Sequence, residues 1–328
     1  MACHSSNYAQ TALHQQLNTA YEQYREPSLT QKRFKHTDLL PLIEKRSNHP
    51  LFKVTKAGES VEGRAIYVVK VGTGKTKVLL WSQMHGDEST ATMALMDVMN
   101  FFEQKDGLDA IRKQLLNQLS IFMIPMLNPD GAERFQRQNA MGVDLNRDAL
   151  RLQNPESKIL KQVRDDLQPA WGFNLHDQSR YYAVGNTSKP ATISFLAPAY
   201  NEQKEVNETR GDAMKLIVVM NKMLQKYLPG QVAKYSDAFE PRAFGDNIQK
   251  WGTRTILIES GGHYNDPEKQ FIRKMNFLAL MTALESIAQQ PTLVRVWITT
   301  KIFHSIKVGY TTLYCERYKY NLTIKLLN

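Results

Sequence analysis

Residues 77–88 read KVLLWSQMHGDE, an apolar run that passes directly into a polar cluster. A short apolar run of this kind is typical of a strand buried on both faces of a sheet. His85 and Glu88 then stand three residues apart on the turn that leaves the strand, where both could reach one cation. Gly86 between them permits the tight backbone that this needs. On its own, a His-x-x-Glu pair fits a surface hydrogen bond better than a metal site.

Strand-like and helix-like patterns alternate along the rest of the chain. Further strands are predicted at 52–54, 64–70, 119–127, 170–175 and 255–258. Helical spacing of apolar residues recurs over 94–102, 202–227 and 267–288. This alternation predicts an α/β domain with a largely parallel sheet covered by helices. Ligand sites in such sheets lie beyond the carboxyl ends of the strands, so we expect functional residues directly after the apolar runs.

Two further polar side chains end apolar runs. His176 follows the run 170–175 and could supply a third metal ligand, with Asp177 or Gln178 orienting a ligand from behind. Glu259 follows the run 255–258 and could act as a general base beside a metal. The structural alternatives are a histidine satisfied at a strand end and a buried ion pair of Glu259, for example with Arg254.

A fourth group follows the run 119–127. Asn128-Pro-Asp-Gly131 is a strong turn signal. Beyond it, Arg137, Asn146 and Arg147 bring two guanidinium groups and an amide close together in sequence, which suits a carboxylate or a developing oxyanion. The alternative is that these arginines pair with nearby acids on a solvated face: Glu133, Asp144 or Asp148.

Taken together and in this order, the clusters resemble the M14 family of zinc carboxypeptidases. The resemblance spans about Glu59 to Ala288 and is carried by these motifs: His85-x-x-Glu88, Asn128-Pro-Asp-Gly131, Arg137-x-Asn139, Gly142-Val-Asp-Leu-Asn-Arg147, His176 and Glu259. More narrowly, the stretches 81–89 and 145–150 are similar to bacterial members of the Bacteroidetes type. The resemblance implies a mixed, twisted sheet with helices on both faces.

The resemblance also implies a role for each matched residue. One zinc ion would be bound by His85, Glu88 and His176, with Glu259 as general base. Arg137 would polarise the scissile carbonyl. Asn146 and Arg147 would bind the terminal carboxylate of a peptide or other small carboxylate-bearing substrate.

Some positions depart from the family pattern. Asp87 stands where many digestive members have an arginine, so we expect a different peptide preference. Asp246, in the segment 244–247, could face the substrate side chain and favour a basic or amino-bearing group. The family often carries a tyrosine some twenty residues before the catalytic glutamate; Tyr235 and Phe239 are the nearest candidates, and no tyrosine is assigned.

The expected domain organisation has three parts. Residues 1–50 form a helical extension packed on the domain, 51–290 form the zinc peptidase domain, and 291–328 form an atypical tail, truncated or out of frame. The formal net charge is +10, and half of it lies in this tail, where six Lys or Arg face one acid. The remaining surplus gives little reason to expect a nucleic-acid partner. No signal peptide, disulfide framework or membrane-spanning run is evident, which favours a cytoplasmic protein without a membrane partner.

Two other functions remain open. An N-acyl amino acid deacylase of the aspartoacylase or succinylglutamate-desuccinylase type has a similar fold and zinc set, although the Asn-Pro-Asp-Gly and Gly-Val-Asp-Leu-Asn-Arg motifs favour a peptidase. A binding protein that kept only the fold would be expected to lack His85, Glu88, His176 or Glu259, and all four are present.

Overall fold

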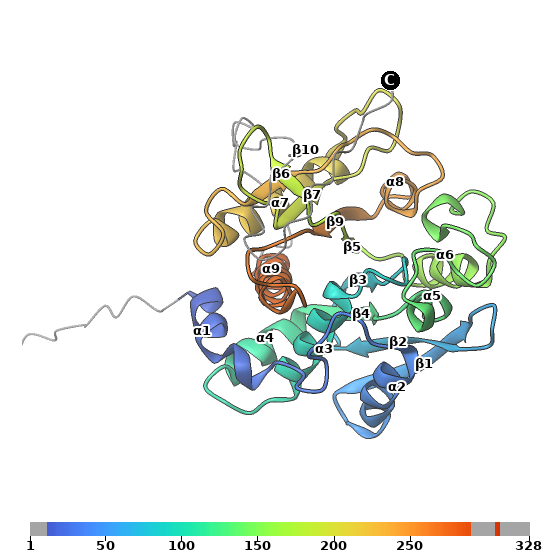
Figure 1. Cartoon of the computed structure of the whole chain (residues 1–328). Coiled ribbons are helices and arrows are strands. Elements are labelled where there is room, and N and C mark those ends of the chain that lie inside the picture. The colour runs from blue at the N-terminus through green and yellow to red at the C-terminus, as the bar shows by residue number, and fades with distance from the viewer. Residues whose placement is uncertain (1–11, 290–305, 309–328) are drawn as a thin grey trace, which may run out of the picture.

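The computed structural model describes residues 12–289 and 306–308 (Figure 1). Its centre is an eight-stranded sheet made of β1 (Phe52–Glu59), β2 (Ala65–Val71), β3 (Thr76–Ser82), β4 (Leu119–Ile124), β5 (Trp171–Asp177), β7 (Ile193–Leu196), β8 (Val232–Lys234) and β9 (Arg254–Ser260). A two-stranded sheet pairs β6 (Tyr182–Val184) with β10 (Ile306–Val308).

The strand order is β1-β2-β4-β3-β5-β9-β7-β8. The middle strands β4, β3, β5 and β9 run parallel to one another. Antiparallel pairs flank them, β1 with β2, β2 with β4, and β7 with β9, while β8 runs parallel to β7. The predicted mixed sheet with a parallel centre is therefore confirmed.

Helices cover both faces of this sheet (Figure 1). They are α1 (Leu13–Ala20), α2 (His36–Glu44), α3 (Thr90–Glu103), α4 (Asp109–Gln118), α5 (Pro129–Arg134), α6 (Pro155–Leu167), α7 (Glu208–Leu224), α8 (Phe244–Lys250) and α9 (Gln270–Gln289), with short 3₁₀ turns at Tyr21–Gln23, Lys45–Asn48 and Leu145–Arg147. None of the helices in these described residues is both long and apolar enough to cross a membrane.

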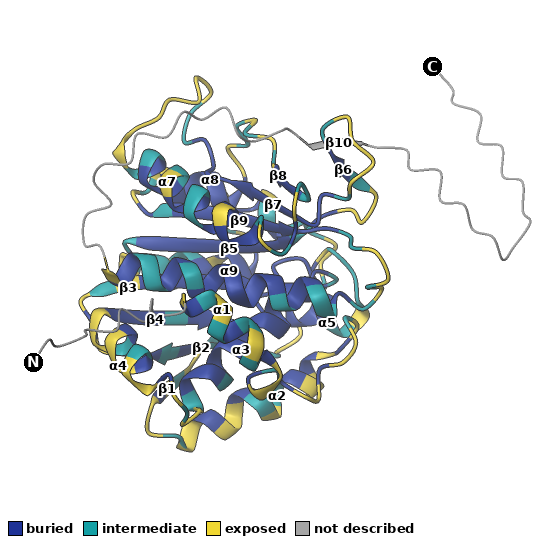
Figure 2. Cartoon of the chain, turned by 90° about the vertical axis from the view of Figure 1, so that its left-hand side faces the viewer, coloured by how far each residue is buried: buried dark blue, intermediate teal, exposed yellow. Residues whose placement is uncertain are grey.

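Strand β3 shows how one run of residues supplies two cores. Val78 and Leu80 belong to the larger apolar cluster, which includes residues of α3, α7 and α9. Leu79 and Trp81 point to the opposite face and join the smaller cluster, which includes residues of α6 and α8. Successive side chains of a strand alternate between the faces of a sheet, so an uninterrupted apolar run is what a doubly covered strand requires. Figure 2 shows the central strands and α9 as the buried middle of the molecule.

The N-terminal segment is tied to the domain by a buried ion pair. Arg273 of α9 and Asp97 of α3 are both fully buried and face one another. The Tyr21 hydroxyl donates to Asp97 over 2.7 Å, and the Arg273 guanidinium donates to the Glu26 carbonyl over 3.0 Å. Truncating Arg273 or Asp97 would leave the other charge buried and unpaired. Because Tyr21 and Glu26 bond to this ion pair, it holds the N-terminal segment against α3 and α9.

The structure also differs from the sequence-based expectations. Strand β4 ends at Ile124, three residues short of the predicted run, because Pro125 has no N–H to continue the ladder. Helix α7 begins at Glu208 and not near 202. The helices α4, α6 and α8 were not predicted, and neither were the short strands β6, β7 and β8. The expected tail, 291–328, lies outside the described residues except for Ile306–Val308.

Gly86 generates a prediction about stability. A Cβ atom there would lie 2.0 Å from the carbonyl carbon of Gly131 and 2.3 Å from the Ala132 nitrogen, both backbone atoms of α5. Gly86→Ala is therefore expected to lower the free energy of unfolding by about 3 kcal/mol, measured by urea denaturation. Gly107→Ala is the control, because nothing lies within 4 Å of its added Cβ, and it should change stability by less than about 0.5 kcal/mol. Equal effects of the two substitutions would contradict this packing argument.

Candidate metal centre

Three neighbouring parallel strands end at one place. Strands β3, β5 and β9 lie side by side, and their carboxyl ends carry His85, His176 and Glu259. His176 and Glu259 are register partners on β5 and β9. The sheet thus places at one edge the side chains that the sequence predicts to act together.

His85, Glu88 and His176 form a compact, buried group. Their potential ligand atoms all lie within 4.8 Å of one another. The two Nδ1 atoms of the histidines are 3.2 Å apart. Each Nδ1 lies 2.8 Å from a different oxygen of Glu88, His85 beside Oε1 and His176 beside Oε2.

The turn at 128–131 holds the loop that carries His85. The Asn128 side chain accepts from the Gly131 N–H and caps α5, where the sequence predicts only a turn. Its amide group donates to the carbonyls of Met84 and Arg137, over 3.2 and 3.3 Å. One asparagine therefore fixes the loop that carries His85 and the backbone of Arg137 together.

Burial and mutual charge interactions shift the pKa values of these three residues. Burial acts to lower the pKa of His85, but the charge of Glu88 and a hydrogen bond to Asp144 raise it to about 9. Burial acts to raise the pKa of Glu88, but His85 and His176 hold it below its ordinary value. Burial lowers the pKa of His176. In this arrangement a proton on His85 offsets the charge of the Glu88 carboxylate, a role that a cation could take.

These residues fit a zinc ion. Two imidazole nitrogens and one carboxylate form the His₂Glu set that catalytic zinc sites use, with a further position left for water or substrate. His85 also presents its other nitrogen, Nε2, to Asp144 Oδ1 at 2.9 Å. A carboxylate on the second ring nitrogen fixes the tautomer and orientation that a metal-binding histidine needs.

Arg137 lies against the metal group. Its Nη1 lies 3.0 Å from Glu88 Oε1, and its Nη2 lies 3.0 Å from Asp144 Oδ2. Of the ion pairs expected under the structural alternative, the one with Asp144 is present, but it connects Arg137 to His85 rather than to an outer face. The side chain is 40% exposed, so part of it is open to solvent.

Asn146 and Arg147 reach towards helix α8. The Asn146 side-chain oxygen accepts from the Phe244 N–H over 2.9 Å, and the Arg147 Nε lies 3.5 Å from Glu240 Oε2. Arg147 is also 40% exposed. Asp144 connects the pair to the metal group, because its Oδ1 accepts from the Asn146 N–H and also faces His85.

Glu259 is buried beside this group. Its Oε2 atom makes no hydrogen bond within the described part of the chain. Burial, followed by the negative charges of Glu88 and Asp177, raises its pKa well above the ordinary value. The suggested partner Arg254 instead pairs with Asp212, with Nε 2.9 Å from Oδ2. The ion pair suggested between Glu259 and Arg254 is therefore wrong.

Other predicted residues lie around the edge of the site. Asp246 is buried near Arg147, and burial raises its pKa to about 6. Tyr235 is half-buried, and burial followed by the charge of Glu259 raises its pKa. Asp87 is partly buried, and burial followed by the charge of Glu88 raises its pKa. Tyr235 thus lies within the electrostatic reach of Glu259, although the sequence assigned no tyrosine.

Lys269 is a site residue that the sequence did not indicate. Its ammonium group lies 2.9 Å from Asp177 Oδ2 and donates to the Ser260 carbonyl over 2.9 Å. The backbone N–H of Asp177 in turn donates to Glu88 Oε2 over 3.1 Å. A lysine in a loop after β9 carries no motif, so only the fold reveals this contact.

Comparisons with known proteins agree with this geometry. Residues 42–207, half of the chain, match the model of the zinc carboxypeptidase family, Peptidase M14. Carboxypeptidase SOL1 of Arabidopsis thaliana is 25% identical over 175 residues, which is 44% of this chain and 35% of that protein. Carboxypeptidase A2 of Mus musculus is 26% identical over 161 residues, 48% of this chain and 35% of that protein. The chain thus spans about a third of the length of these curated relatives.

Solved structures share the fold. A metallo-carboxypeptidase from Burkholderia cenocepacia superposes with a TM-score of 0.61 at 16% identity, over 78% of this chain and 70% of that one. A metallo-carboxypeptidase from Pseudomonas aeruginosa, solved in complex with (2-guanidinoethylmercapto)succinic acid, gives a TM-score of 0.58 at 18% identity, over 78% of this chain and 68% of that one. With the family model covering half of its residues, the chain belongs to the zinc carboxypeptidase family.

Proposed function

We propose that this chain is a zinc-dependent metallocarboxypeptidase, which hydrolyses a peptide or peptide-like amide bond near a free carboxylate. The observation that carries the proposal is the convergence of His85, Glu88 and His176 beside Glu259, whose buried Oε2 atom has no partner among the described residues. One zinc ion would be held by the two Nδ1 atoms and the Glu88 carboxylate. Zinc bound there would supply Lewis acidity, which polarises a carbonyl and acidifies water.

Glu259 is proposed as the general base. It would take a proton from the attacking water and later deliver it to the leaving amine. A carboxyl group with a raised pKa suits both transfers better than an ordinary one, because a general base works best with a pKa near the working pH. The negative neighbours Glu88 and Asp177 supply this shift on top of burial.

The arginines are proposed to bind the substrate. The partly exposed side chain of Arg137 would donate hydrogen bonds to the oxygen of the scissile carbonyl as negative charge develops on it. Asn146 and Arg147 would hold the terminal carboxylate, for which a guanidinium offers paired donors. The tie of Asp144 to His85, Arg137 and the Asn146 backbone supports this arrangement, because it keeps the reacting centre and the carboxylate site at a fixed separation.

The metal assignment predicts a gain in stability that is independent of activity. Zinc at a hundredfold excess over its dissociation constant should stabilise the folded chain by about 2.7 kcal/mol, seen as a raised thermal unfolding midpoint. His85→Ala should abolish the increase. His49→Ala is the matched control, because His49 lies outside the metal group and packs against the Phe52 ring at a tilt. A full zinc response in His85→Ala would remove His85 from the ligand set.

The general base is tested by Glu259→Gln. This substitution should lower kcat about 10²- to 10⁴-fold without loss of bound zinc, measured with unblocked peptides and by metal analysis. Glu285→Gln, on α9 and hydrogen-bonded to Gln289, is the control and should retain full turnover. An active, zinc-replete Glu259→Gln enzyme would refute the assignment.

The same assay separates the peptidase from the N-acyl amino acid deacylase. A carboxypeptidase releases the last residue of a peptide with a free C-terminus and leaves the amidated peptide intact. Turnover of N-acyl amino acids together with failure on all free peptides would favour the deacylase.

Asp246 gives a pH dependence with a definite sign. Its pKa is raised from 3.8 to about 6 in the folded chain, so folding favours the protonated form. Its contribution to stability is therefore complete below pH 3.8 and is lost as the pH rises through about 6. Asp246→Asn should raise the free energy of unfolding at pH 7 by about 2 kcal/mol and remove most of this dependence. Asp166→Asn, at an exposed site, should leave the pH profile unchanged, and an unaltered profile in Asp246→Asn would contradict the prediction.

A further inference from the structure

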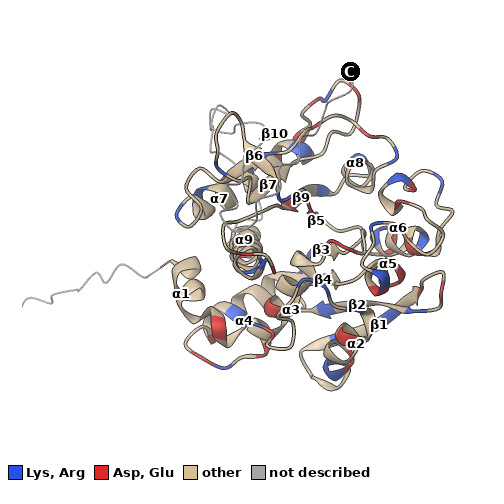
Figure 3. Cartoon of the chain, viewed as in Figure 1, with Lys and Arg blue, Asp and Glu red and all other residues tan. Residues whose placement is uncertain are grey.

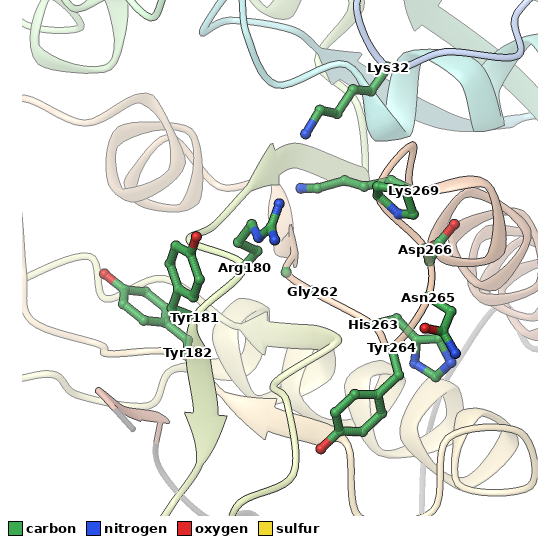
Figure 4. Close-up of a pocket in the computed structure, with 12 residues that line it drawn as sticks. Lys32, Arg180, Tyr181, Tyr182, Gly262, His263, Tyr264, Asn265, Asp266 and Lys269 are labelled. Carbon is green, nitrogen blue, oxygen red and sulfur yellow. The ribbon is translucent and has the colours of Figure 1, made fainter. Parts of the chain in front are cut away.

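A pocket of about 360 Å³ is lined by residues that follow β5 and β9 in the chain (Figure 4). Its walls come from the loop after β5, the loop after β9 and the N-terminal segment around Lys32. Its volume is in the range of small-ligand and side-chain sites. The proposed function leaves this pocket without a role.

Three cations face the pocket from three separate segments. They are Lys32, Arg180 and Lys269, whose nitrogen atoms point towards the same region in Figure 4. Lys269 is paired with Asp177. Neither Lys32 nor Arg180 pairs its side-chain charge with a carboxylate anywhere in the described ranges 12–289 and 306–308. Figure 3 shows Lys and Arg interspersed with Asp and Glu along much of the ribbon, in contrast to the three cations of this wall.

Asp266, the one acid among the described residues that line the pocket, already has hydrogen-bond partners. Asp266 accepts hydrogen bonds from the backbone N–H groups of Phe271 and Ile272, over 3.2 and 3.1 Å, at the start of α9. It therefore caps that helix and does not pair with Lys32 or Arg180. The pocket is left with a positive field.

The backbone that forms the pocket is closely packed. A Cβ atom on Gly262 would lie 2.4 Å from the Arg180 carbonyl oxygen, so the loops after β5 and β9 touch. Lys32 is held by its own backbone, since its N–H donates to Glu268 over 3.0 Å and its carbonyl accepts from the Ser89 hydroxyl. The backbone that carries Lys32 and Arg180 is thus held in place by its own contacts. The rings of Tyr181, Tyr182 and Tyr264 add apolar surface beside them.

A continuous series of contacts runs across the site, from Asn146 and Arg147 to the pocket. Asn146 and Arg147 lie at one end and connect through Asp144 to His85 and Glu88. Glu88 connects through Asp177 to Lys269, at the edge of the pocket. A substrate whose terminal carboxylate is held at Arg147 would therefore extend its amino-terminal part beyond the metal group towards the pocket. Each extended residue spans about 3.3–3.6 Å, so a side chain a few residues upstream would reach it.

We propose that this pocket, lined by Lys32 and Arg180, binds an acidic side chain of the substrate on the amino side of the cleaved bond. The inference rests on the proposed peptidase function. It adds a preference for a substrate side chain on the amino side of the cleaved bond, where no binding residue has been assigned. Opposite charge at a partly exposed site favours the acidic peptide modestly, and added salt weakens the effect.

The test is a set of N-acylated peptides with free C-termini, identical except for Glu, Gln or Lys placed in turn at each of the four positions upstream of the cleaved bond. At one of these positions, Glu should raise kcat/KM about fivefold over Gln, and Lys should lower it. The Glu-to-Gln ratio should fall near unity in the double variant Arg180→Gln/Lys32→Gln, and should shrink in high salt. Arg180→Lys keeps the charge and should retain a preference for Glu.

The matched control removes the same charge elsewhere. Lys113→Gln/Lys222→Gln alters two exposed lysines on α4 and α7 and should keep the wild-type ratio. Cleavage of Glu and Gln peptides at equal rates at every position, or a ratio that survives Arg180→Gln/Lys32→Gln, overturns the inference while leaving the peptidase function standing. Failure to cleave any peptide in the set overturns the proposed function, and this inference with it.

Discussion

The structure depends on keeping carboxylates buried side by side at the ends of neighbouring strands. Glu88 and Glu259 lie close enough that the charge of one raises the pKa of the other, and Asp177 adds to the same field. Arg137 pairs with Glu88, and Lys269 with Asp177, so each is already engaged. Burial of like charges is unfavourable unless a cation compensates it. In the proposed metal site, a divalent ion between His85, Glu88 and His176 would compensate this buried negative charge.

The surrounding fold holds these charged side chains in position. Parallel pairing of β3, β5 and β9 delivers the three key side chains to one edge. The apolar cores on both faces, one with α3 and α9 and the other with α6 and α8, keep those strands in place. Asn128 and Gly86 then fix the connecting loop against α5, where backbone atoms approach too closely for any side chain. Packing of the backbone therefore preorganises the candidate site.

A feature of the fold or of the site could be predicted from the sequence only where a local pattern of residues indicates it. The run 77–82 and its polar successors predicted β3 and the metal loop, because a strand buried on both faces has to be apolar throughout. Pro125 could have shortened the predicted β4, since proline cannot continue a ladder. The roles of Asp144 and Lys269 could not be derived in this way. Their partners, His85 and Asp177, lie 59 and 92 residues away in the chain, and only the fold brings them together. The fit of Arg180 and Lys32 into one pocket is non-local for the same reason.

The central claim, that His85, Glu88 and His176 form one zinc site, is tested most directly by zinc K-edge X-ray absorption of the purified, zinc-loaded chain. The claim predicts one zinc per chain in a shell of nitrogen and oxygen atoms at about 2.0–2.2 Å, with imidazole scattering and no sulfur. A sulfur shell near about 2.3 Å would place the metal on a cysteine, and a spectrum of fully hydrated zinc would show that the chain holds no zinc at all. Either result would contradict the account.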